Sequence, residues 1–520
     1  MATESRVKKS LLNARVNLFF YFLSVPLAFF SRKIFLDSLG ADFIGLTETL
    51  YNLLGFFSLA ELGIGAAIGY VLYKPLFDDN RTKLNEIISV FGYLFRKVGL
   101  VILSTGCVFA CFLPLIFPRT EFSFGIIYFA YFSFLTSSLI GYFINYRQIL
   151  LGADQKNYVI MVCSQTTAIV KILIQLVCAC YIGNYYLWIA IELIFGIIYS
   201  FILNWKINQI YPWLKSEIKQ GKELFKNYPE VMKYAKQLFV QKISDFFQFQ
   251  TAPFLIYAFV SLQTVAYYGN YTLITTKIFQ FVNNFLGSTG AGVGNLIAEG
   301  NKTKIMKVYW ELFSIRMFIA GIVCTSLFFL LEPFIVLWIG EKYLLEKIVL
   351  ILIILTIFFN ITRDATIQFL YGYGLFWDVW ASIIEVLIYV SVAIIGGFIW
   401  ELPGVLLGSV ISLIPVIVIW KPYLLYRWGF KENVIYYWMG YFKHLILLFL
   451  PAIACYYFLL WTAICPKDSY LNWIIYASLC VIFYSVSLYI LFLLFTQGIR
   501  DFTRRIIDNI LRRSDHPKVK

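Results

Sequence analysis

The chain has 520 residues, of which 60% are hydrophobic and 19% aromatic, and its formal net charge is +14. A water-soluble protein of this length could not bury so much apolar surface, so the composition excludes a soluble globular protein and predicts a membrane protein. The nine cysteines show no metal-binding or disulfide spacing, and there are only two histidines. We therefore expect no metal site, no cofactor and no catalytic residues.

Arg6, Lys8 and Lys9 are basic and precede an apolar run at residues 18–30. Arg32 and Lys33 follow where a signal peptide would show small residues for cleavage, so we expect an uncleaved first span. Hydropathy predicts an all-α polytopic membrane protein with about fourteen spans joined by short connections. The predicted spans are residues 11–34, 43–73, 98–117, 123–146, 158–182, 185–205, 239–260, 264–297, 312–338, 346–370, 378–400, 402–426, 438–463 and 470–496.

The second of these spans, residues 43–73, combines a carboxylate with small residues. Glu61, Gly65 and Gly69 are spaced i, i+4, i+8 and therefore share one helix face. A carboxylate that faces lipid is costly, so Glu61 should point into the protein. There it either lines a polar pathway or makes a buried hydrogen bond to a neighbouring helix. The glycines would let another helix approach closely.

Positive charges are distributed unevenly among the predicted loops. If the N-terminus is cytoplasmic, most of the 43 Lys and Arg fall on the cytoplasmic side, so we predict that both termini lie in the cytoplasm. The net charge then reports topology, and we expect no nucleic-acid partner. The cations outside this pattern are Arg32, Lys33, Arg119, Lys342, Lys347 and Lys467 on outer segments, and Lys171 and Lys277 within spans.

The chain also repeats itself weakly. Spans 2 and 8 both carry closely spaced glycines, and residues 147–152 resemble residues 367–372. Two six-span halves that enter the membrane from the same side fit both observations. The predicted parts are an N-lobe at 1–209, a basic cytoplasmic linker at 210–238, a C-lobe at 239–427, two extra spans at 428–498 and a basic amphipathic cytoplasmic tail at 499–520. The candidate packing glycines are Gly63, Gly65, Gly69, Gly290 and Gly292.

Two cytoplasmic segments are amphipathic. In the tail, apolar residues between Ile499 and Leu511 fall at helical spacing with arginines among them, which predicts a helix on the anionic inner leaflet. Residues 213–242 repeat this pattern with lysines. That second segment is either a similar surface helix or a solvated basic tether.

Charged residues within or near the spans are the candidates for function, because each costs about 3 kcal/mol unless it is paired or hydrated. Lys171 and Glu192 lie on adjacent antiparallel spans and either pair with each other or serve a ligand. Arg316 is expected to extend to the cytoplasmic surface. The candidates for substrate binding are Arg32, Lys171, Lys277, Arg316 and Arg363, and the candidates for ion coupling are Glu61, Asp245 and Glu385.

Two stretches resemble a known family. Residues 32–46, RKIFLDSLGADFIGL, and residues 60–70, AELGIGAAIGY, resemble bacterial polysaccharide repeat-unit flippases of the Wzx type. This family belongs to the multidrug/oligosaccharidyl-lipid/polysaccharide (MOP) exporter superfamily, with the lipid II flippases and the multidrug and toxin extrusion (MATE) antiporters. The resemblance implies two MATE-like six-helix lobes around a central cavity, and alternating access.

The same resemblance implies the substrate and the partners. An undecaprenyl-diphosphate-linked oligosaccharide would move from the inner to the outer leaflet of the bacterial cytoplasmic membrane, for O-antigen or capsule biosynthesis. Arg32 and Lys277 would hold the diphosphate, and transport could be coupled to Na⁺ or H⁺. A polysaccharide polymerase and a chain-length regulator would be further partners, beside membrane lipids. Arg15 and Arg32 are the only arginines of span 1, which favours the polysaccharide branch over the lipid II branch.

Three alternatives stay open at this point. A MATE-type antiporter of small molecules would share the fold, although such antiporters usually end after twelve spans. A membrane-embedded glycan polymerase or ligase would need a sizeable outer loop, and the predicted outer segments are short. A structural membrane protein is disfavoured by the many charges within spans.

Overall fold

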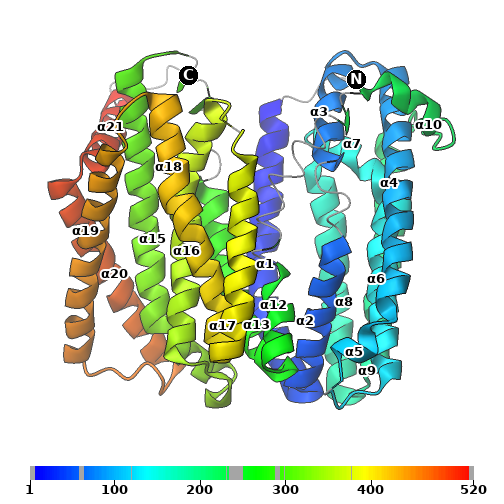
Figure 1. Ribbon diagram of the computed structural model, residues 1–520, viewed down its shortest axis with the longest axis horizontal. Coiled ribbons are helices and arrows are strands. Elements are labelled where there is room, and N and C mark those ends of the chain that lie inside the picture. Colours follow the sequence, from blue (N-terminus) through cyan, green and yellow to red (C-terminus); the bar gives the residue numbers. More distant parts are fainter. Residues whose placement is uncertain are drawn as a thin grey trace. The chain divides into compact units, whose positions relative to one another are not determined.

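The computed structural model describes residues 6–57, 64–118, 120–229, 231–232, 247, 250–286, 293–294, 296–297, 299–375 and 377–514. These residues are mainly helical and contain no strand. The chain divides into two compact units, Met1–Ala266 and Tyr267–Lys520. Figure 1 colours the first unit blue to green and the second green to red. This division into two units does not test the predicted boundaries of the lobes, the linker and the tail, which stay predictions.

Ten helical stretches among the described residues are long and apolar enough to cross a membrane. A helix needs about 20 apolar residues to span the hydrocarbon core, and each of these stretches overlaps at least one predicted span. The all-α polytopic membrane fold is therefore confirmed. The stretches are Leu12–Leu39, Arg81–Ala110, Phe124–Phe143, Asn157–Tyr181, Tyr185–Ile210, Lys302–Trp338, Lys347–Gly372, Val379–Phe430, Ile435–Trp461 and Tyr470–Phe495.

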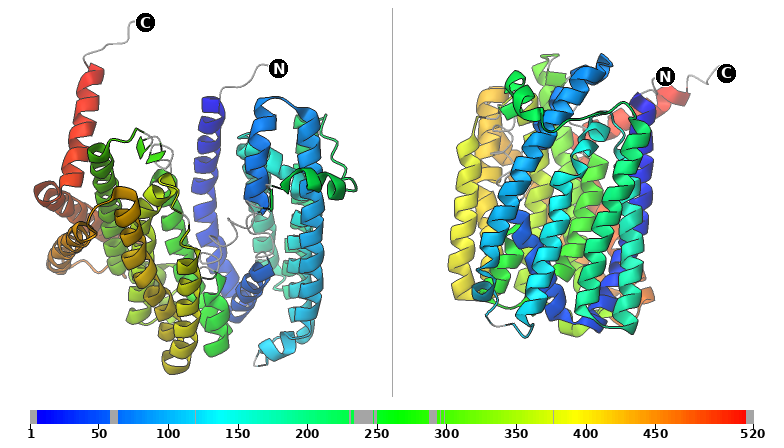
Figure 2. Two further views of the ribbon diagram at one scale, coloured as in Figure 1. Left: turned by 45° about the horizontal axis from the view of Figure 1, so that its top comes forward. Right: turned by 90° about the vertical axis from the view of Figure 1, so that its right-hand side faces the viewer.

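The first unit is a helical bundle, and three of its helices, α4, α6 and α9, begin at a capping side chain. The side chains of Asn80, Ser123 and Asn184 each accept a hydrogen bond from the first turn of the helix that follows. The long helices of this unit run side by side in Figures 1 and 2. Its α-helices are α1 (Arg6–Leu39), α2 (Ala41–Gly55), α3 (Ile64–Phe77), α4 (Arg81–Ala110), α5 (Leu113–Ile116), α6 (Phe124–Phe143), α7 (Gln148–Ala153), α8 (Asn157–Tyr181), α9 (Tyr185–Ile210), α10 (Gly221–Leu224) and α12 (Ala252–Phe259).

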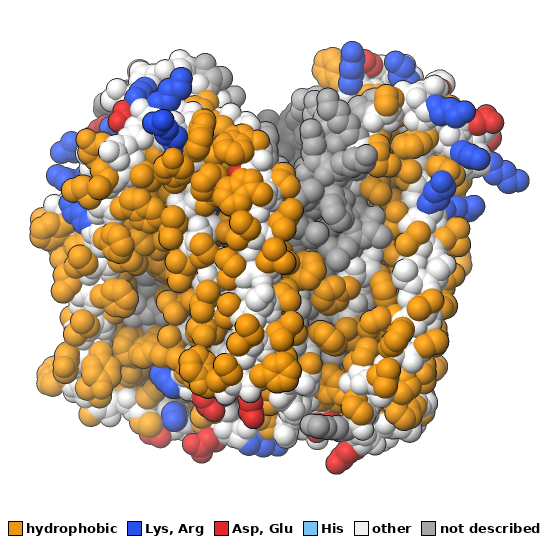
Figure 3. All heavy atoms as spheres, in the orientation of Figure 1, with side chains coloured by type: hydrophobic (Ala, Val, Ile, Leu, Met, Phe, Trp, Pro, Cys, Tyr) orange, Lys and Arg blue, Asp and Glu red, His pale blue; other side chains and the backbone are white. Residues whose placement is uncertain are grey.

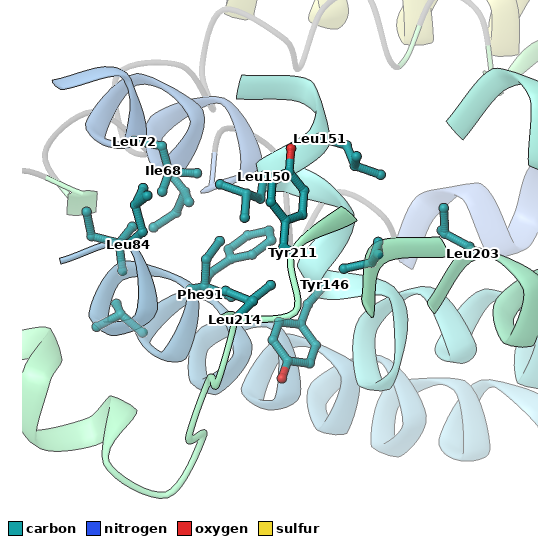
Figure 4. Packing of buried hydrophobic residues seen from close by; sticks show 14 of the residues in the cluster. Ile68, Leu72, Leu84, Phe91, Tyr146, Leu150, Leu151, Leu203, Tyr211 and Leu214 are labelled. Atoms are coloured by element: carbon teal, nitrogen blue, oxygen red, sulfur yellow. The ribbon is translucent and has the colours of Figure 1, made fainter. Parts of the chain in front are cut away.

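A cluster of fully buried aliphatic side chains holds one end of this bundle together. It brings together Ile68 of α3, Leu84 of α4, Leu150 of α7 and Leu203 of α9 (Figure 4). Tyr211, just after α9, closes the cluster and donates its hydroxyl to Asp154 Oδ2 at 2.8 Å. Burial, and then the neighbouring carboxylate, raise the pKa of Tyr211, so the hydroxyl keeps its proton.

The first part of the predicted basic linker packs on α4. The backbone amide of Lys215 donates to Asn85 Oδ1 at 2.8 Å, and the Tyr228 hydroxyl donates to Glu86 Oε2 at 2.8 Å. An added Cβ at Gly221 would lie 2.4 Å from the carbonyl oxygen of Ser89, so only glycine fits at this contact. The described part of this segment is therefore neither a long surface helix nor a freely solvated tether.

The second unit contains α15, which at 37 residues is the longest helix among the described residues. Its α-helices are α13 (Leu262–Leu286), which crosses the boundary between the units, α15 (Lys302–Trp338), α16 (Lys347–Gly372), α17 (Val379–Leu413), α18 (Lys421–Leu424), α19 (Ile435–Trp461), α20 (Tyr470–Phe495) and α21 (Gln497–Ser514). Two π-helical stretches flank α18, Ile414–Trp420 and Leu425–Phe430. α21 leads the chain to its C-terminus (Figure 2).

α17 is a helical hairpin. Trp400 and Glu401 have non-helical backbone angles, and Glu401 has a φ of 52°. The two arms touch through glycine, because an added Cβ at Gly404 would lie 1.9 Å from the carbonyl oxygen of Gly396. The break falls where the sequence placed the boundary between the spans at 378–400 and 402–426.

The predicted second span is described in two parts. α2 ends at Gly55 and α3 begins at Ile64, and residues 58–63, which include Glu61 and Gly63, lie outside the described residues. An added Cβ at Gly65 or Gly69 meets no described atom within 4 Å, so the close contact expected at these glycines has no support here and stays a prediction. Gly290, Gly292 and Asp245 also lie outside the described residues.

Candidate functional site

Arg32 is paired with a carboxylate. Gly40, with a φ of 84°, ends α1 and lets α2 turn back along it. As a result, Arg32 Nη1 lies 2.6 Å from Glu48 Oε1, and Nη2 donates to the carbonyl oxygen of Ala266 at 2.8 Å. The side chains are 12% and 29% exposed. The predicted diphosphate ligand would therefore meet an arginine that Glu48 already neutralises in part.

Lys171 and Glu192 form the ion pair that the sequence left open. Lys171 Nζ of α8 lies 2.5 Å from Glu192 Oε1 of α9. Gln175, one turn along α8, donates to Glu192 Oε2 at 3.1 Å and to the carbonyl oxygen of Trp188 at 3.2 Å. A cavity of about 160 Å³ opens beside this pair within the first unit.

Arg316 does not reach the cytoplasmic surface, and that expectation was wrong. It is 2% exposed on α15, and its Nη1 lies 3.0 Å from Asp364 Oδ2 of α16. The same nitrogen donates to the carbonyl oxygen of Ile361 at 3.3 Å. Its Nη2 is buried without a hydrogen-bond partner among the described residues. A carboxylate within reach, which hydropathy cannot reveal, holds the guanidinium inside.

The remaining described candidates lie in the second unit. Lys277 on α13 and Arg363 on α16 are half-buried, and Glu385 on α17 is 5% exposed. Whether any of these side chains, or Arg32, Lys171 and Arg316, touches a substrate or an ion stays a prediction. Within the described part of the chain, no group of three or more His, Cys, Asp or Glu could hold a metal ion.

Sequence reasoning missed one buried charge cluster. Asp378 precedes the hairpin α17, and its Oδ2 accepts hydrogen bonds from Lys421 Nζ at 2.6 Å and Trp420 Nε1 at 3.1 Å. The sequence pattern could have indicated this pair. Asp378 begins the predicted span at 378–400 and Lys421 lies near the end of the antiparallel span at 402–426, so the two residues lie on the same side of the membrane. This pair joins the ends of the hairpin arms.

An apolar groove of about 680 Å³ runs along the second unit and was not predicted from the sequence. α15, α16 and α19 supply most of its lining, and Tyr484 of α20 closes it. Phe449 and Tyr457 are both 65% exposed, so the groove opens at the surface. Hydrophobic side chains cover the visible flanks of both units, and Lys and Arg gather near their ends (Figure 3).

Comparison with known proteins gives the fold. No protein-family model matches the chain, and no curated protein sequence does. A solved structure of the lipid II flippase MurJ in an inward closed conformation matches with a TM-score of 0.64 and 15% identity, over 94% of this chain and 99% of that chain. An inward-facing multidrug resistance MATE family transporter of the MOP superfamily matches with a TM-score of 0.59 and 15% identity, over 80% and 98%.

A MOP superfamily transporter from Pyrococcus furiosus, whose binding pocket is described as having reverse polarity, matches with a TM-score of 0.54 and 16% identity, over 82% and 97%. At such identities the comparisons establish the fold and not the substrate. The protein therefore has the multi-pass membrane fold that the MurJ flippase shares with the MATE transporters.

Proposed function

We propose that this protein flips a polyprenyl-diphosphate-linked oligosaccharide from the inner to the outer leaflet of the bacterial cytoplasmic membrane, for surface polysaccharide biosynthesis. Both termini would lie in the cytoplasm, and a polymerase and a chain-length regulator would use the product. The match to the lipid II flippase over 94% of the chain supports a lipid-linked substrate. The solved structures compared here are transporters and a flippase, which lends no support to the polymerase or ligase alternative.

The observation that carries this proposal is the apolar groove of the second unit. A pocket for a water-soluble drug usually combines apolar walls with a few well-placed polar groups. Here the lining is almost wholly aromatic and aliphatic, with the Thr325 hydroxyl and several tyrosines as its polar atoms. Such a surface suits a long hydrocarbon chain, which gains by contact area rather than by hydrogen bonds.

The charged residues of the ion pairs would bind the polar part of a lipid-linked substrate, its diphosphate. A diphosphate gains from arginine, which can donate two parallel hydrogen bonds, and the candidates are the partly buried Arg32 and the buried Arg316. Lys277 and Arg363 would add positive charge. Coupling to Na⁺ or H⁺ would fall to the carboxylates, with Glu385 as the described candidate and Glu61 and Asp245 as the others.

A small-molecule antiporter of the MATE type is the second candidate. The MATE structure matches over 98% of its own length, so the whole antiporter fold is contained in this chain. It leaves about a fifth of this chain unmatched, whereas the flippase match covers nearly all of it. That difference favours the flippase, and an efflux assay separates the two functions.

The test uses a strain that lacks its own repeat-unit flippase. Expression of this protein should restore surface glycan and should leave resistance to cationic drugs unchanged. Ala452→Trp, which fills the groove, should lower the restored glycan several-fold, whereas Ala454→Trp, at an exposed position outside the groove, should not. Immunoblots check that both variants reach wild-type levels. Drug resistance without surface glycan would reject the flippase in favour of the antiporter.

A further inference from the structure

The cavity beside Lys171 lies between α6, α8 and α9 of the first unit, where a membrane protein would ordinarily pack apolar side chains. Besides Lys171 and Glu192, four hydroxyl groups line it, from Ser137, Ser164, Thr167 and Tyr199. The aromatic ring of Phe195 completes one wall. A polar lining on three neighbouring helices is costly in a membrane unless water or a ligand uses it.

The cavity faces the inside of the bundle. On α8 and on α9, exposed apolar residues lie on the side of the helix opposite the cavity residues, whereas Ile174 and Ile202 lie at the edge of the cavity side. Those on the opposite side include Val162, Leu173 and Val177 on α8, and Ile194, Ile197 and Phe201 on α9. The ion pair is therefore turned away from the apolar surface of the unit.

Two of the hydroxyl groups, those of Ser164 and Thr167, are arranged to accept hydrogen bonds. Thr167 Oγ1 donates its proton to the carbonyl oxygen of Cys163 at 2.7 Å, and Ser164 Oγ donates to that of Met161 at 3.2 Å. Because these protons are already donated, the two hydroxyl oxygens would act toward a ligand as hydrogen-bond acceptors. The Lys171 ammonium carries three N–H donors, of which Glu192 takes one. The lining thus offers both donors and acceptors.

Gly196 of α9 leaves space for the Ser137 hydroxyl of α6. An added Cβ at Gly196 would lie 2.6 Å from Ser137 Oγ, so a larger residue would push the serine away. The charges of Lys171 and Glu192 cancel, which disfavours a lone cation or anion as the guest. The volume is about half that of a small drug-sized pocket, which starts at about 300 Å³.

From these features we propose that the cavity binds one sugar ring of the transported glycan. A sugar ring is neutral, carries hydroxyls that both donate and accept, and has a C–H face that packs on aromatic rings such as Phe195 and Tyr199. The inference rests on the proposed flippase function and adds a recognition site for the head group. An oligosaccharide would place a single ring there and leave its other rings outside.

The experiment measures sugar binding to the full-length protein in nanodiscs. The probes are the methyl glycosides of glucose, galactose and N-acetylglucosamine at millimolar concentrations, read by saturation-transfer NMR. Wild-type protein should bind at least one of them. Thr167→Val keeps the shape and removes the hydroxyl, so its affinity should fall about threefold to tenfold. The matched control is Thr105→Val on α4, whose exposed hydroxyl also donates to a backbone carbonyl, and it should bind like wild type.

The ion pair is tested with both charges removed together, because one charge left alone could unfold the protein. Lys171→Met/Glu192→Gln should retain the wild-type melting temperature within a few degrees and should bind the glycoside at least tenfold more weakly. If wild type binds none of the glycosides, or if Thr167→Val binds as well as Thr105→Val, the proposal is overturned. Sugar binding that follows these variants, in a protein that restores no surface glycan, would keep the site and reject the flippase.

Discussion

Buried charges in this protein act through their partners. A lone charge in the membrane costs about 3 kcal/mol on insertion scales, and a partner within 3 Å offsets much of that cost. The loss of one partner then leaves the other charge unpaired, which is worse than the loss of both. Two pairs that join the same two helices, α15 and α16, allow a direct comparison: the buried Arg316–Asp364 and the more exposed Lys347–Glu332.

Arg316→Met should lower the free energy of unfolding by about 3 kcal/mol, because Asp364 is left unpaired. Lys347→Met should cost less than about 1 kcal/mol, since its side chain is 48% exposed and the pair is screened. Arg316→Met/Asp364→Asn should recover part of the loss. Thermal melts in detergent measure all three variants. A double variant no more stable than Arg316→Met would show that the arginine acts by packing and not by charge.

Arg32 poses a different question, since Glu48 already shares its charge. If Arg32 holds the substrate diphosphate, Glu48→Gln should raise flipping or leave it unchanged, because the arginine gains positive character. Arg32→Ala should then reduce flipping at least tenfold, and Arg32→Lys should recover only part of it. Surface glycan per unit of protein is the measurement. Equal losses in Arg32→Ala and Glu48→Gln, together with lower melting temperatures, would mean that the pair only fastens α1 to α2.

At the level of elements, the hairpin α17 depends on glycine contact between its arms. A methyl group at Gly404 cannot fit 1.9 Å from a carbonyl oxygen, so Gly404→Ala must separate the arms and should cost about 2–3 kcal/mol. Gly141→Ala on α6 has no described neighbour within 4 Å and should be neutral or up to about 1 kcal/mol stabilising. The melting temperatures of the two variants measure this difference in stability. A similar stability for both would show that the arms can part without cost.

α21 is fastened to α15 by two ion pairs. Asp501 lies 3.5 Å from Lys307, and Arg505 lies 2.9 Å from Glu311, which is itself 2% exposed. The members of each helix are one turn apart, so the two pairs fix the register between the helices. Ile506 and Ile507, which are 42% and 49% exposed, face away and suit the predicted contact with the inner leaflet.

Arg505→Glu should loosen α21, because two carboxylates would then meet at a buried position. Hydrogen–deuterium exchange of residues 497–508 should rise about tenfold or more in nanodiscs. Arg504→Glu makes the same charge change at the preceding residue, which is exposed, and should leave the exchange rate near that of the wild type. Protection that is lost equally in both variants would point to lipid charge, and not to Glu311, as the anchor.

Local features of this fold and one ion pair were predictable from the sequence, whereas the other pairings were not. The break at Trp400–Glu401 could be placed because a charged residue and Pro403 interrupt an apolar run. The Lys171–Glu192 pair could be anticipated because the residues face each other on adjacent spans. The buried position of Arg316 could not, since it depends on a partner on another helix. Glycine spacing likewise predicts an available surface at Gly65 without saying whether a helix occupies it.

At the scale of the whole molecule, the orientation of the protein in the membrane is a prediction from its loop charges. The distribution of Lys and Arg predicts that a reporter fused after Lys467 lies outside and that one fused after Lys520 lies inside. Paired alkaline phosphatase and fluorescent-protein fusions measure this directly. The opposite pattern would place the basic segments outside and would reverse the proposed direction of transport.

The buried ion pairs have a consequence for how the chain is made. Arg32–Glu48, Lys171–Glu192 and Arg316–Asp364 each join helices that follow one another in membrane order: α1 with α2, α8 with α9, and α15 with α16. A nascent helix with an unpaired charge partitions poorly into lipid, but in each of these three pairs the partner lies on the next helix to leave the ribosome. Such helices should therefore leave the translocon two at a time, with the charges neutralised inside each pair before either helix meets lipid.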